Sequence, residues 1–363
     1  MKIHYWAGTL QTREQVLRRP TRPVEVQPEK TISQLLGEMS LTGFQGRKLG
    51  EAADVWTAML KKREIVIWMG LAGAMVPAGM RELITYLVRR RMVDVLVTTG
   101  ATLYHDAYET IGGKHFLGTD TIDNVMLRRH RIDRVYDVYA DENKFYRLDV
   151  MIEKEFSNRL QSGRPYSSRE IMYEFGKWIS EKSKNRDGIC VAAYEMGVPV
   201  FVPAFCDSGL GFSLMFANRR KKRRVVVDHM RDVDESSKIT EKARRTAVIV
   251  VGGGVPKNFI QQTAVIASYQ TRHDHTHDFA IQFTTDVPQW GGLSGSTFEE
   301  AQSWGKYNRQ SKMVQCFTDA TIALPIVAHG LSQRFKRLRR HVPEFHWSGT
   351  NGGLRISYES TRL

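Results

Sequence analysis

The chain has little cysteine: three residues in 363, Cys190, Cys206 and Cys316. An odd number of widely spaced cysteines argues against a disulfide framework and against a zinc ribbon. The sequence also lacks a run of about 18 uncharged apolar residues, the length that spans a bilayer, and its first residues have no apolar signal core. These absences predict a cytoplasmic protein that neither enters nor crosses a membrane.

Negative charge is also in short supply, because 53 Lys and Arg residues face 39 Asp and Glu residues and leave a formal charge of +14. The excess lies in three basic runs, at 89–91, 219–224 and 334–340. A basic chain can bind nucleic acid, but no aromatic residues alternate with these runs and no nucleic-acid motif accompanies them. We interpret the runs as solvated helix ends and loops, and keep an anionic partner as the weaker alternative.

Hydrophobic residues make up 42% of the chain, enough for the core of one large domain. Strand-like runs at 64–69 and 93–97 flank a helical pattern at 78–90, which is a βαβ unit. Further strand-like runs follow at 198–202, 224–227, 247–251, 279–283 and 313–317. The alternation predicts an α/β fold with a mostly parallel sheet, helices on both faces and a ligand site beyond the carboxyl ends of the strands.

The expected organisation has three parts. Residues 1–30 contain prolines at 20, 23 and 28 and are expected to form an irregular arm. Residues 31–340 are expected to form a single Rossmann-like domain. Residues 341–363 lose periodicity and predict a tail or an added hairpin. Within the domain, helical patterns cover 32–39 and 51–62, and a capping box at 167–170 opens another helix.

Three strand ends carry glycine or hydroxyl residues, at 69–73 (MGLAG), 97–101 (VTTGA) and 250–255 (VVGGGV). Glycine lets the main chain approach a pyrophosphate, and a following helix offers free N–H groups to it. Each segment alone is typical of an ordinary turn, and the G-x-G-x-x-G pattern is absent. The three together indicate a nucleotide site.

Residues 297–306 (TFEEAQSWGK) predict a short helix that Gly305 ends, with Lys306 just past it and Trp304 close by. A lysine that forms an imine attacks as the neutral amine, so its pKa has to fall from about 10.4 through burial or a nearby positive charge. The ordinary alternative is a surface lysine after a helix end, and the pattern alone favours that alternative.

A histidine-rich segment at 273–278 (HDHTHD) precedes the 279–283 strand. Alternating histidines on one face of a strand can hold a metal ion. We prefer a polar loop, and predict no metal site.

Ordered motifs between residues 64 and 331 resemble the deoxyhypusine synthase family. They are residues 69–70, 79–82, 92–99, 199–204 with Asp207 and 210–211, 252–257, 300–306 and 318–321. The resemblance implies a transferase that uses NAD to move an aminobutyl group of spermidine between amines through a covalent lysine imine. Lys306 would carry the imine, and Trp304 would line the polyamine pocket.

The resemblance also implies where NAD would bind and how the protein assembles. A homotetramer with its sites at subunit interfaces is expected. The cofactor contacts would come from strand ends and two acids suited to ribose hydroxyls, namely Thr98, Thr99, Gly100, Gly252, Gly253, Gly254, Asp207 and Asp319.

The substrate pocket departs from the family pattern at three positions. Phe212 and Leu293 stand where the family has acids that bind amines, and Asn258 stands where it has a histidine. An ammonium left unpaired in a pocket costs several kcal/mol, so unaltered spermidine binding is not expected. Glu300 remains as an amine anchor.

The segment Tyr104-His105-Asp106 stands where the family has a glutamate pair. We hypothesise that His105 is the proton acceptor that Asn258 cannot be, and that Asp106 contacts the substrate. A purely structural role for His105 is an equal alternative.

These variants resemble the deoxyhypusine synthase-like branch, whose relatives include enzymes that make homospermidine. The preferred function is therefore aminobutyl transfer to a small amine such as putrescine. Two alternatives stay open: authentic deoxyhypusine synthase, which modifies a lysine of a translation factor, and an inactive scaffold that binds NAD or another anion.

Overall fold

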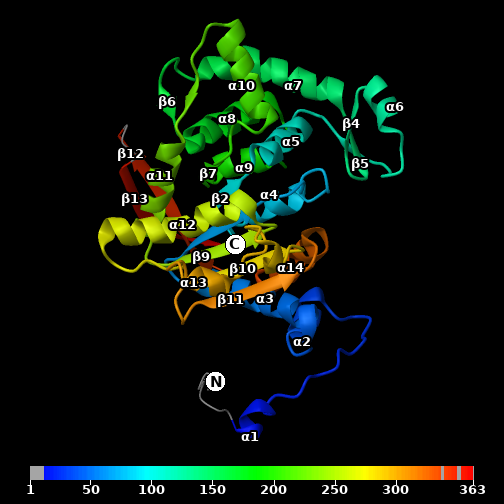
Figure 1. Ribbon diagram of the computed structural model, residues 1–363, viewed down its shortest axis with the longest axis vertical. Helices are drawn as coiled ribbons and strands as arrows, with labels where there is room; N and C mark the ends of the chain where they lie inside the picture. The colour runs from blue at the N-terminus through cyan, green and yellow to red at the C-terminus, as the bar shows by residue number, and fades with distance from the viewer. Residues whose placement is uncertain (1–11, 337–338, 350–352, 363) are drawn as a thin grey trace, which may run out of the picture.

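The computed structural model describes residues 12–336, 339–349 and 353–362. The arm expected over residues 1–30 is therefore described from residue 12, and residues 1–11 lie outside the described part. It contains the short helix α1 (Arg13–Val16) and an extended stretch that runs away from the rest of the molecule (Figure 1). No helix within the described ranges is long and apolar enough to cross a membrane.

A six-stranded parallel sheet forms the centre of the molecule, in the order β11-β10-β9-β1-β2-β7. Every residue of β1, β9 and β10 is buried, as expected of central parallel strands covered on both faces. The strands are β1 (Val66–Leu71), β2 (Val95–Thr98), β7 (Val200–Phe201), β9 (Thr246–Val251), β10 (Phe279–Thr284) and β11 (Lys312–Phe317). The predicted α/β fold with a mostly parallel sheet is confirmed.

Helices cover both faces of this sheet (Figure 1). Alternate side chains of β1 supply the two cores, because Ile67 and Met69 join one apolar cluster while Val66 and Trp68 join the other. The first face carries α2 (Ile32–Met39), α3 (Phe44–Lys61), α4 (Arg81–Arg89) and α14 (Ala320–Arg334). The second face carries α11 (His229–Lys242), α12 (Gly254–Thr271) and α13 (Phe298–Gln302).

The remaining helices and a small sheet form the upper part of Figure 1. The helices are α5 (Gly100–Thr110), α6 (Asn124–Arg129), α7 (Glu142–Lys154), α8 (Ser168–Lys182), α9 (Ile189–Glu195) and α10 (Gly209–Arg220), with the 3₁₀ turns η1 (Phe156–Arg159) and, near the sheet, η2 (Pro288–Trp290). The antiparallel sheet has the order β3-β5-β4, with β3 (His115–Leu117), β4 (Ile132–Val135) and β5 (Val138–Asp141). The capping box expected at Ser167 and Glu170 opens α8.

One predicted strand does not belong to the central sheet. The 224–227 run contains only the two-residue strand β8 (Val226–Val227), which pairs with β6 (Pro165–Tyr166) instead. Both valines are only partly buried and follow the basic 219–224 run, so the segment lacks the continuous apolar surface of a central strand.

A long C-terminal hairpin of β12 (Arg339–Ser348) and β13 (Gly353–Arg362) packs near α11. Arg340 is buried and forms a bidentate pair with Asp94, at 2.8 Å to Oδ1 and 2.5 Å to Oδ2. The Oδ2 atom of Asp94 also accepts the backbone N–H of Ile67 in β1. The hairpin is therefore tied to the central sheet by a buried ion pair.

Candidate active site

A cavity of about 250 Å³ lies between α12 and α13 and contains several of the predicted substrate residues. It is lined by Asn258 from α12, Leu293 from the loop before α13, Glu300 from α13, and Trp304 and Lys306 from the turn after it. Thr297 caps α13, and Gly305 allows the positive φ of +72° that ends the turn. Motifs that lie 48 residues apart, at Asn258 and Lys306, therefore meet at one site.

Lys306 is held with its amine inside this cavity. The side chain is only 8% exposed, and its Nζ donates a hydrogen bond to Oδ1 of Asn258 at 2.9 Å. Burial lowers the pKa of Lys306, while the negative charge of Glu300 partly opposes that change. The ordinary alternative, a solvated surface lysine, does not describe this residue.

A second buried lysine, Lys257, braces the loop that carries Leu293. Its Nζ donates to the carbonyl of Ser296 at 2.6 Å and to Oε1 of Gln282 at 3.0 Å. Burial, and then the positive charge of Lys306, lower the pKa of Lys257 to about 8. Two amines with lowered pKa thus lie near one another, and the sequence indicated only one of them.

Trp304 and Leu293 form the rim of the cavity. Trp304 is 66% exposed and Leu293 is 46% exposed, so the predicted aromatic wall lies at the mouth of the cavity rather than over the amine. Among the described residues that line the cavity, Glu300 is the only acid. The site therefore offers one carboxylate to a substrate ammonium.

The glycine-rich turn before α12 leaves its backbone accessible in part. Gly252 and Gly254 have φ of +73° and +57°, and a Cβ on Gly254 would meet no atom within 4 Å. A Cβ on Gly253 would lie 2.5 Å from Cα of Ser294, and the N–H of Gly254 donates to Ser294 Oγ at 3.0 Å. The N–H of Gly252 likewise donates to the carbonyl of Phe283, so the open side of the turn is at Gly254, at the N-terminus of α12 with the Ser294 hydroxyl beside it.

The hydroxyls at the end of β2 are largely occupied within the chain. Thr98 is buried and donates to the carbonyl of Leu71, and Thr99 caps α5 by accepting the N–H of Thr102. A Cβ on Gly100 would lie 2.5 Å from Oγ of Ser208, so the start of α5 packs tightly against the start of α10.

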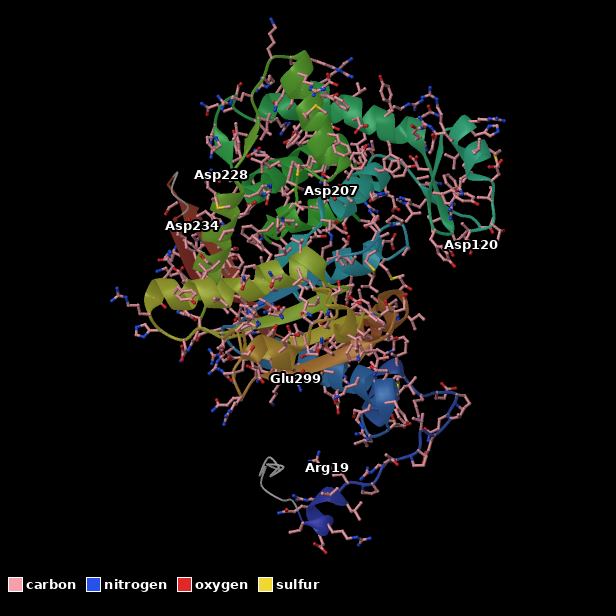
Figure 2. All side chains as sticks on the ribbon, viewed as in Figure 1. Arg19, Asp120, Asp207, Asp228, Asp234 and Glu299 are labelled. Atoms are coloured by element: carbon pink, nitrogen blue, oxygen red, sulfur yellow. The ribbon has the colours of Figure 1, made fainter. Side chains whose placement is uncertain are left out.

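The two acids expected at the ribose hydroxyls, Asp207 and Asp319, are both exposed. They follow β7 and β11, which are the opposite edges of the sheet. With five strand spacings of about 4.8 Å between them, these strands lie roughly 24 Å apart. Figure 2 labels Asp207 beside α10 and Glu299, the neighbour of Glu300, on α13 at the far side of α12.

His105 lies in a different cluster, on α5. Its Nδ1 is 2.9 Å from Nε2 of His115, and Nδ1 of His115 is 2.5 Å from Oε1 of Glu109. Because a carboxylate only accepts, we assign the proton of His115 to its Nδ1, which donates to Glu109. The Nε2 of His115 then accepts a hydrogen bond from Nδ1 of His105. This leaves a free lone pair on Nε2 of His105. Burial, and then repulsion from His115 when that ring is protonated, lower the pKa of His105 to about 4, so His105 is neutral at pH 7 but a weaker base than free imidazole.

Asp106 was expected to contact the substrate, and its surroundings correct that expectation. The residue is fully buried, with Oδ1 2.8 Å from Nε of Arg81 and accepting the N–H of Ile189, and Oδ2 accepting the N–H of Cys190. Its carboxylate joins α4, α5 and α9. Because neighbouring positions on a helix point about 100° apart, the motif that presents His105 turns Asp106 into the core.

Phe212 also lies away from the Lys306 cavity. It is 52% exposed on α10, and the described residues that line the cavity include neither Phe212 nor His105. The structure thus brings together Lys306, Asn258, Glu300, Trp304 and Leu293, but not the α5 and α10 residues.

The histidine-rich segment is a loop before β10. His277 is buried, with its ring Nδ1 2.8 Å from the hydroxyl of Thr246. The backbone N–H of His277 donates to the carbonyl of Lys306. In the described ranges, no group of three or more His, Cys, Asp or Glu residues is placed to hold a metal ion.

Comparison with a solved structure identifies the class of this fold. The chain has a TM-score of 0.56 to a crystal structure of a candidate deoxyhypusine synthase from Entamoeba histolytica, at 17% identity over 83% of this chain and 93% of that one. At this identity the likeness concerns the fold alone.

Sequence comparisons define the family. The deoxyhypusine synthase family model matches residues 34–331. A protein of Methanosarcina mazei named probable deoxyhypusine synthase 2 is 49% identical over 339 residues, covering 93% of this chain and 97% of the relative. A deoxyhypusine synthase-like protein of Chlorobaculum tepidum is 37% identical over 86% of this chain and 89% of its own length. The chain belongs to the deoxyhypusine synthase family, a family of transferases.

Proposed function

We propose that this protein is an NAD-dependent transferase that moves an aminobutyl group from a polyamine to a small amine, such as putrescine, through an imine on Lys306. The observation that carries the proposal is the buried Lys306 amine with a lowered pKa, inside a cavity that also contains Glu300. Family membership supports the same reaction class. We expect the protein to act in the cytoplasm.

Lys306 has the chemistry of the nucleophile. In the neutral form its nitrogen lone pair bonds to the electrophilic carbon of the donor, the bond from that carbon to the leaving amine breaks, and the proton lost by Lys306 leaves with that amine. Asn258 Oδ1 accepts one N–H of Lys306 at 2.9 Å, which orients the remaining lone pair. An acceptor amine then displaces Lys306 in the reverse sense.

The carboxylate of Glu300 selects the acceptor. A diamine that attacks through one neutral amine keeps one ammonium at its far end, and the single acid of the cavity matches that single charge. A polyamine bound in the same way would leave a further ammonium without a partner, at a cost of several kcal/mol.

A bound nicotinamide would supply reversible hydride acceptance, at the carbon next to the donor amine. The open position Gly254 would let its pyrophosphate approach the backbone, with Gly252 and Gly253 shaping the turn, and Asp207 and Asp319 would hold ribose hydroxyls. Because the two acids flank opposite sheet edges, one dinucleotide would reach both only between two copies of the chain. This supports sites at subunit interfaces, and a homotetramer stays the assembly that the family resemblance implies.

We propose His105 as the proton acceptor of the reaction, acting from a neighbouring copy since it does not line the Lys306 cavity. The hydrogen bonds that link Glu109, His115 and His105 fix the proton of His105 on Nδ1 and leave its Nε2 free to accept a proton. His105→Gln is expected to slow turnover and leave Lys306 adduct formation possible. Unchanged turnover and an unchanged pH profile would remove His105 from the mechanism.

Authentic deoxyhypusine synthase activity is the second candidate, because the Methanosarcina mazei relative carries that name. The inactive scaffold is the third, since Phe212 and Leu293 replace acids of the family pattern with exposed apolar side chains. The acceptor distinguishes the first two, and the adduct at Lys306 distinguishes both from the scaffold.

The test is to trap the imine. The protein is incubated with NAD and spermidine, reduced with borohydride and digested, and the peptides are weighed by mass spectrometry. We expect an aminobutyl adduct on Lys306 and none in Lys306→Ala, with the exposed Lys312 unmodified in both. Addition of putrescine, but not of the translation factor, should discharge the adduct. No adduct on Lys306 with any polyamine would favour the scaffold.

A further inference from the structure

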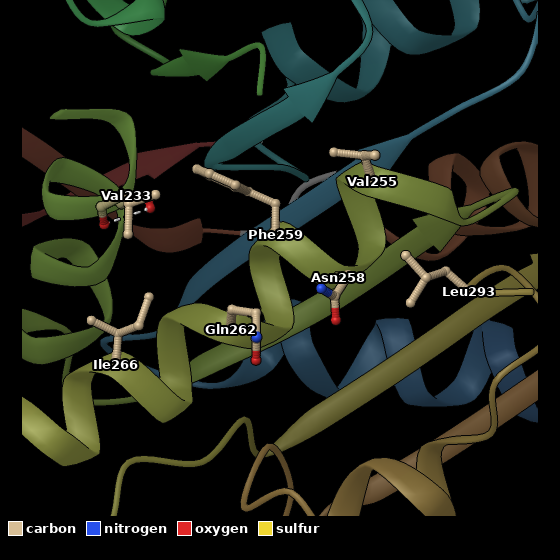
Figure 3. Close-up of a pocket in the computed structure, with 8 residues that line it drawn as sticks. Val233, Val255, Asn258, Phe259, Gln262, Ile266 and Leu293 are labelled. Carbon is tan, nitrogen blue, oxygen red and sulfur yellow. Dashed lines mark hydrogen bonds between the residues drawn. The ribbon is translucent and has the colours of Figure 1, made fainter. Parts of the chain in front are cut away.

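An apolar groove of about 310 Å³ continues from the Lys306 cavity along the outer side of α12. Asn258, Gln262 and Leu293 line both spaces, so the groove and the cavity are joined at these three residues. Figure 3 shows Asn258 and Gln262 with their side chains on the same side of α12, and Leu293 facing Asn258. Among the described residues that line the groove, none carries a charge.

The far part of the groove is mainly apolar, with one hydroxyl, that of Ser236, which donates to the carbonyl of Val233. Phe259 and Ile266 of α12 lie toward Val233 of α11, whereas Val255 lies at the other end of the groove, on the side of Leu293 (Figure 3). From Asn258 to Ile266, eight residues of helix rise about 12 Å. The groove thus offers a mainly apolar path that starts at the reactive amine and, among the described lining residues, passes no charged group that could neutralise a second ammonium.

We propose that this groove binds the hydrocarbon chain of a primary alkylamine acceptor whose amino group lies at Lys306. The inference rests on the proposed function and names a further acceptor class for the same site. The alkylamine nitrogen bonds to the imine carbon and the bond to Lys306 breaks. Return of the hydride removed from the donor then gives an N-alkyl-1,4-diaminobutane without net oxidation.

Binding in the groove removes the apolar surface of the alkyl chain from water. Burying one methylene contributes about 0.8 kcal/mol, a factor of roughly four in affinity. A terminal ammonium in the same groove loses water and meets neutral partners only, the side chains of Ser236, Asn258 and Gln262, among the described lining residues. The affinity for linear monoamines should therefore rise with chain length, whereas the affinity for diamines of equal length should not.

The test compares linear monoamines from n-propylamine to n-octylamine with the matching terminal diamines. KM is measured by mass spectrometry of the products, and binding by calorimetry. We expect KM and Kd of the monoamines to fall by up to roughly fourfold per methylene until the groove is filled. Ile266→Asp should weaken the binding of n-octylamine at least tenfold and strengthen the binding of 1,8-diaminooctane.

Val265→Asp is the matched control, because Val265 is the neighbour of Ile266 and faces a different cavity. Val233→Asp, which lines the same far end of the groove from α11, repeats the test if Ile266→Asp fails to fold. A Lys306 adduct with flat KM and Kd across chain lengths would overturn the groove and keep the proposed function. Binding that depends on chain length, without an adduct on Lys306, would support the groove and overturn the proposed function. Dissociation of an oligomer by Ile266→Asp, with a flat series, would assign the groove to a second copy of the chain and overturn the inference.

Discussion

Replacing Lys257 by methionine tests whether this buried amine holds the loop beside the cavity. Lys257 is 1% exposed and donates to Ser296 O at 2.6 Å and Gln282 Oε1 at 3.0 Å. Each hydrogen bond to a charged group contributes about 1.5–3 kcal/mol. Both oxygens keep a second donor, Gln315 Nε2, at 3.1 and 2.8 Å, and the substitution removes a buried charge. Lys257→Met should therefore lower the free energy of unfolding by about 1–3 kcal/mol at pH 7.

The pH dependence makes the test specific to Lys257. Its pKa is lowered to about 8 in the folded protein from an ordinary value of 10.5. Between these values the unfolded chain binds more protons, so the stability of the wild-type protein rises with pH, by up to about 1.4 kcal/mol per unit. The methionine variant should lack this rise, and its deficit should grow from pH 8 to pH 10.

Urea unfolding followed by circular dichroism at pH 7, 8, 9 and 10 measures both effects. Lys312→Met, at an exposed position on β11, is the control and should stay within about 0.5 kcal/mol of wild type. Parallel pH curves for wild type and Lys257→Met would refute the reasoning, because they would mean that Lys257 has the same pKa in both states.

Three further substitutions test other parts of the account. Asp106→Asn should cost about 3–5 kcal/mol of stability by breaking the buried pair with Arg81, with KM for the amine unchanged; a selective rise in KM at wild-type stability would restore Asp106 as a substrate ligand. Arg340→Met should leave Asp94 short of its partner, lower stability by about 3 kcal/mol and speed hydrogen exchange in β12 and β13; unchanged exchange would show that the pair does not hold the hairpin. Burial lowers the pKa of His277 to about 4, so wild-type stability should fall as pH drops from 6.5 towards 4, and His277→Leu should flatten that fall; an equally steep fall in the variant would contradict it.

Much of the fold could be predicted from local patterns. The helix expected at 32–39 is α2, where Thr31 and Gln34 form a capping box. The buried runs at 64–69 and 93–97 overlap β1 and β2 because central parallel strands require continuous apolar sequence. The three-stranded sheet β3-β5-β4 was not predicted, since its strands are three or four residues long and mostly exposed or partly buried, which leaves almost no periodicity to detect.

The site was predictable where a motif carries its own chemistry, and not where tertiary contacts decide. The segment ending in Lys306 and the position of Asn258 indicated residues that the fold brings within 2.9 Å. The surroundings of Lys257 could not be foreseen, because its partners Gln282 and Ser296 lie 25 and 39 residues further along the chain. A weak signal was present, a lysine directly after a glycine-rich turn, but such a residue is ordinarily solvated.

The pKa of Lys306 shows whether the cavity holds this side chain as a neutral amine ready to attack. Lysine amines labelled by reductive ¹³C-methylation can be followed by NMR against pH, with Lys306→Ala identifying the signal. The account predicts a midpoint below the ordinary 10.5, and a lower one still in Glu300→Gln, because the Glu300 carboxylate raises it. A midpoint at or above 10.5 that does not respond to Glu300→Gln would contradict the claim that this cavity prepares a neutral amine for attack.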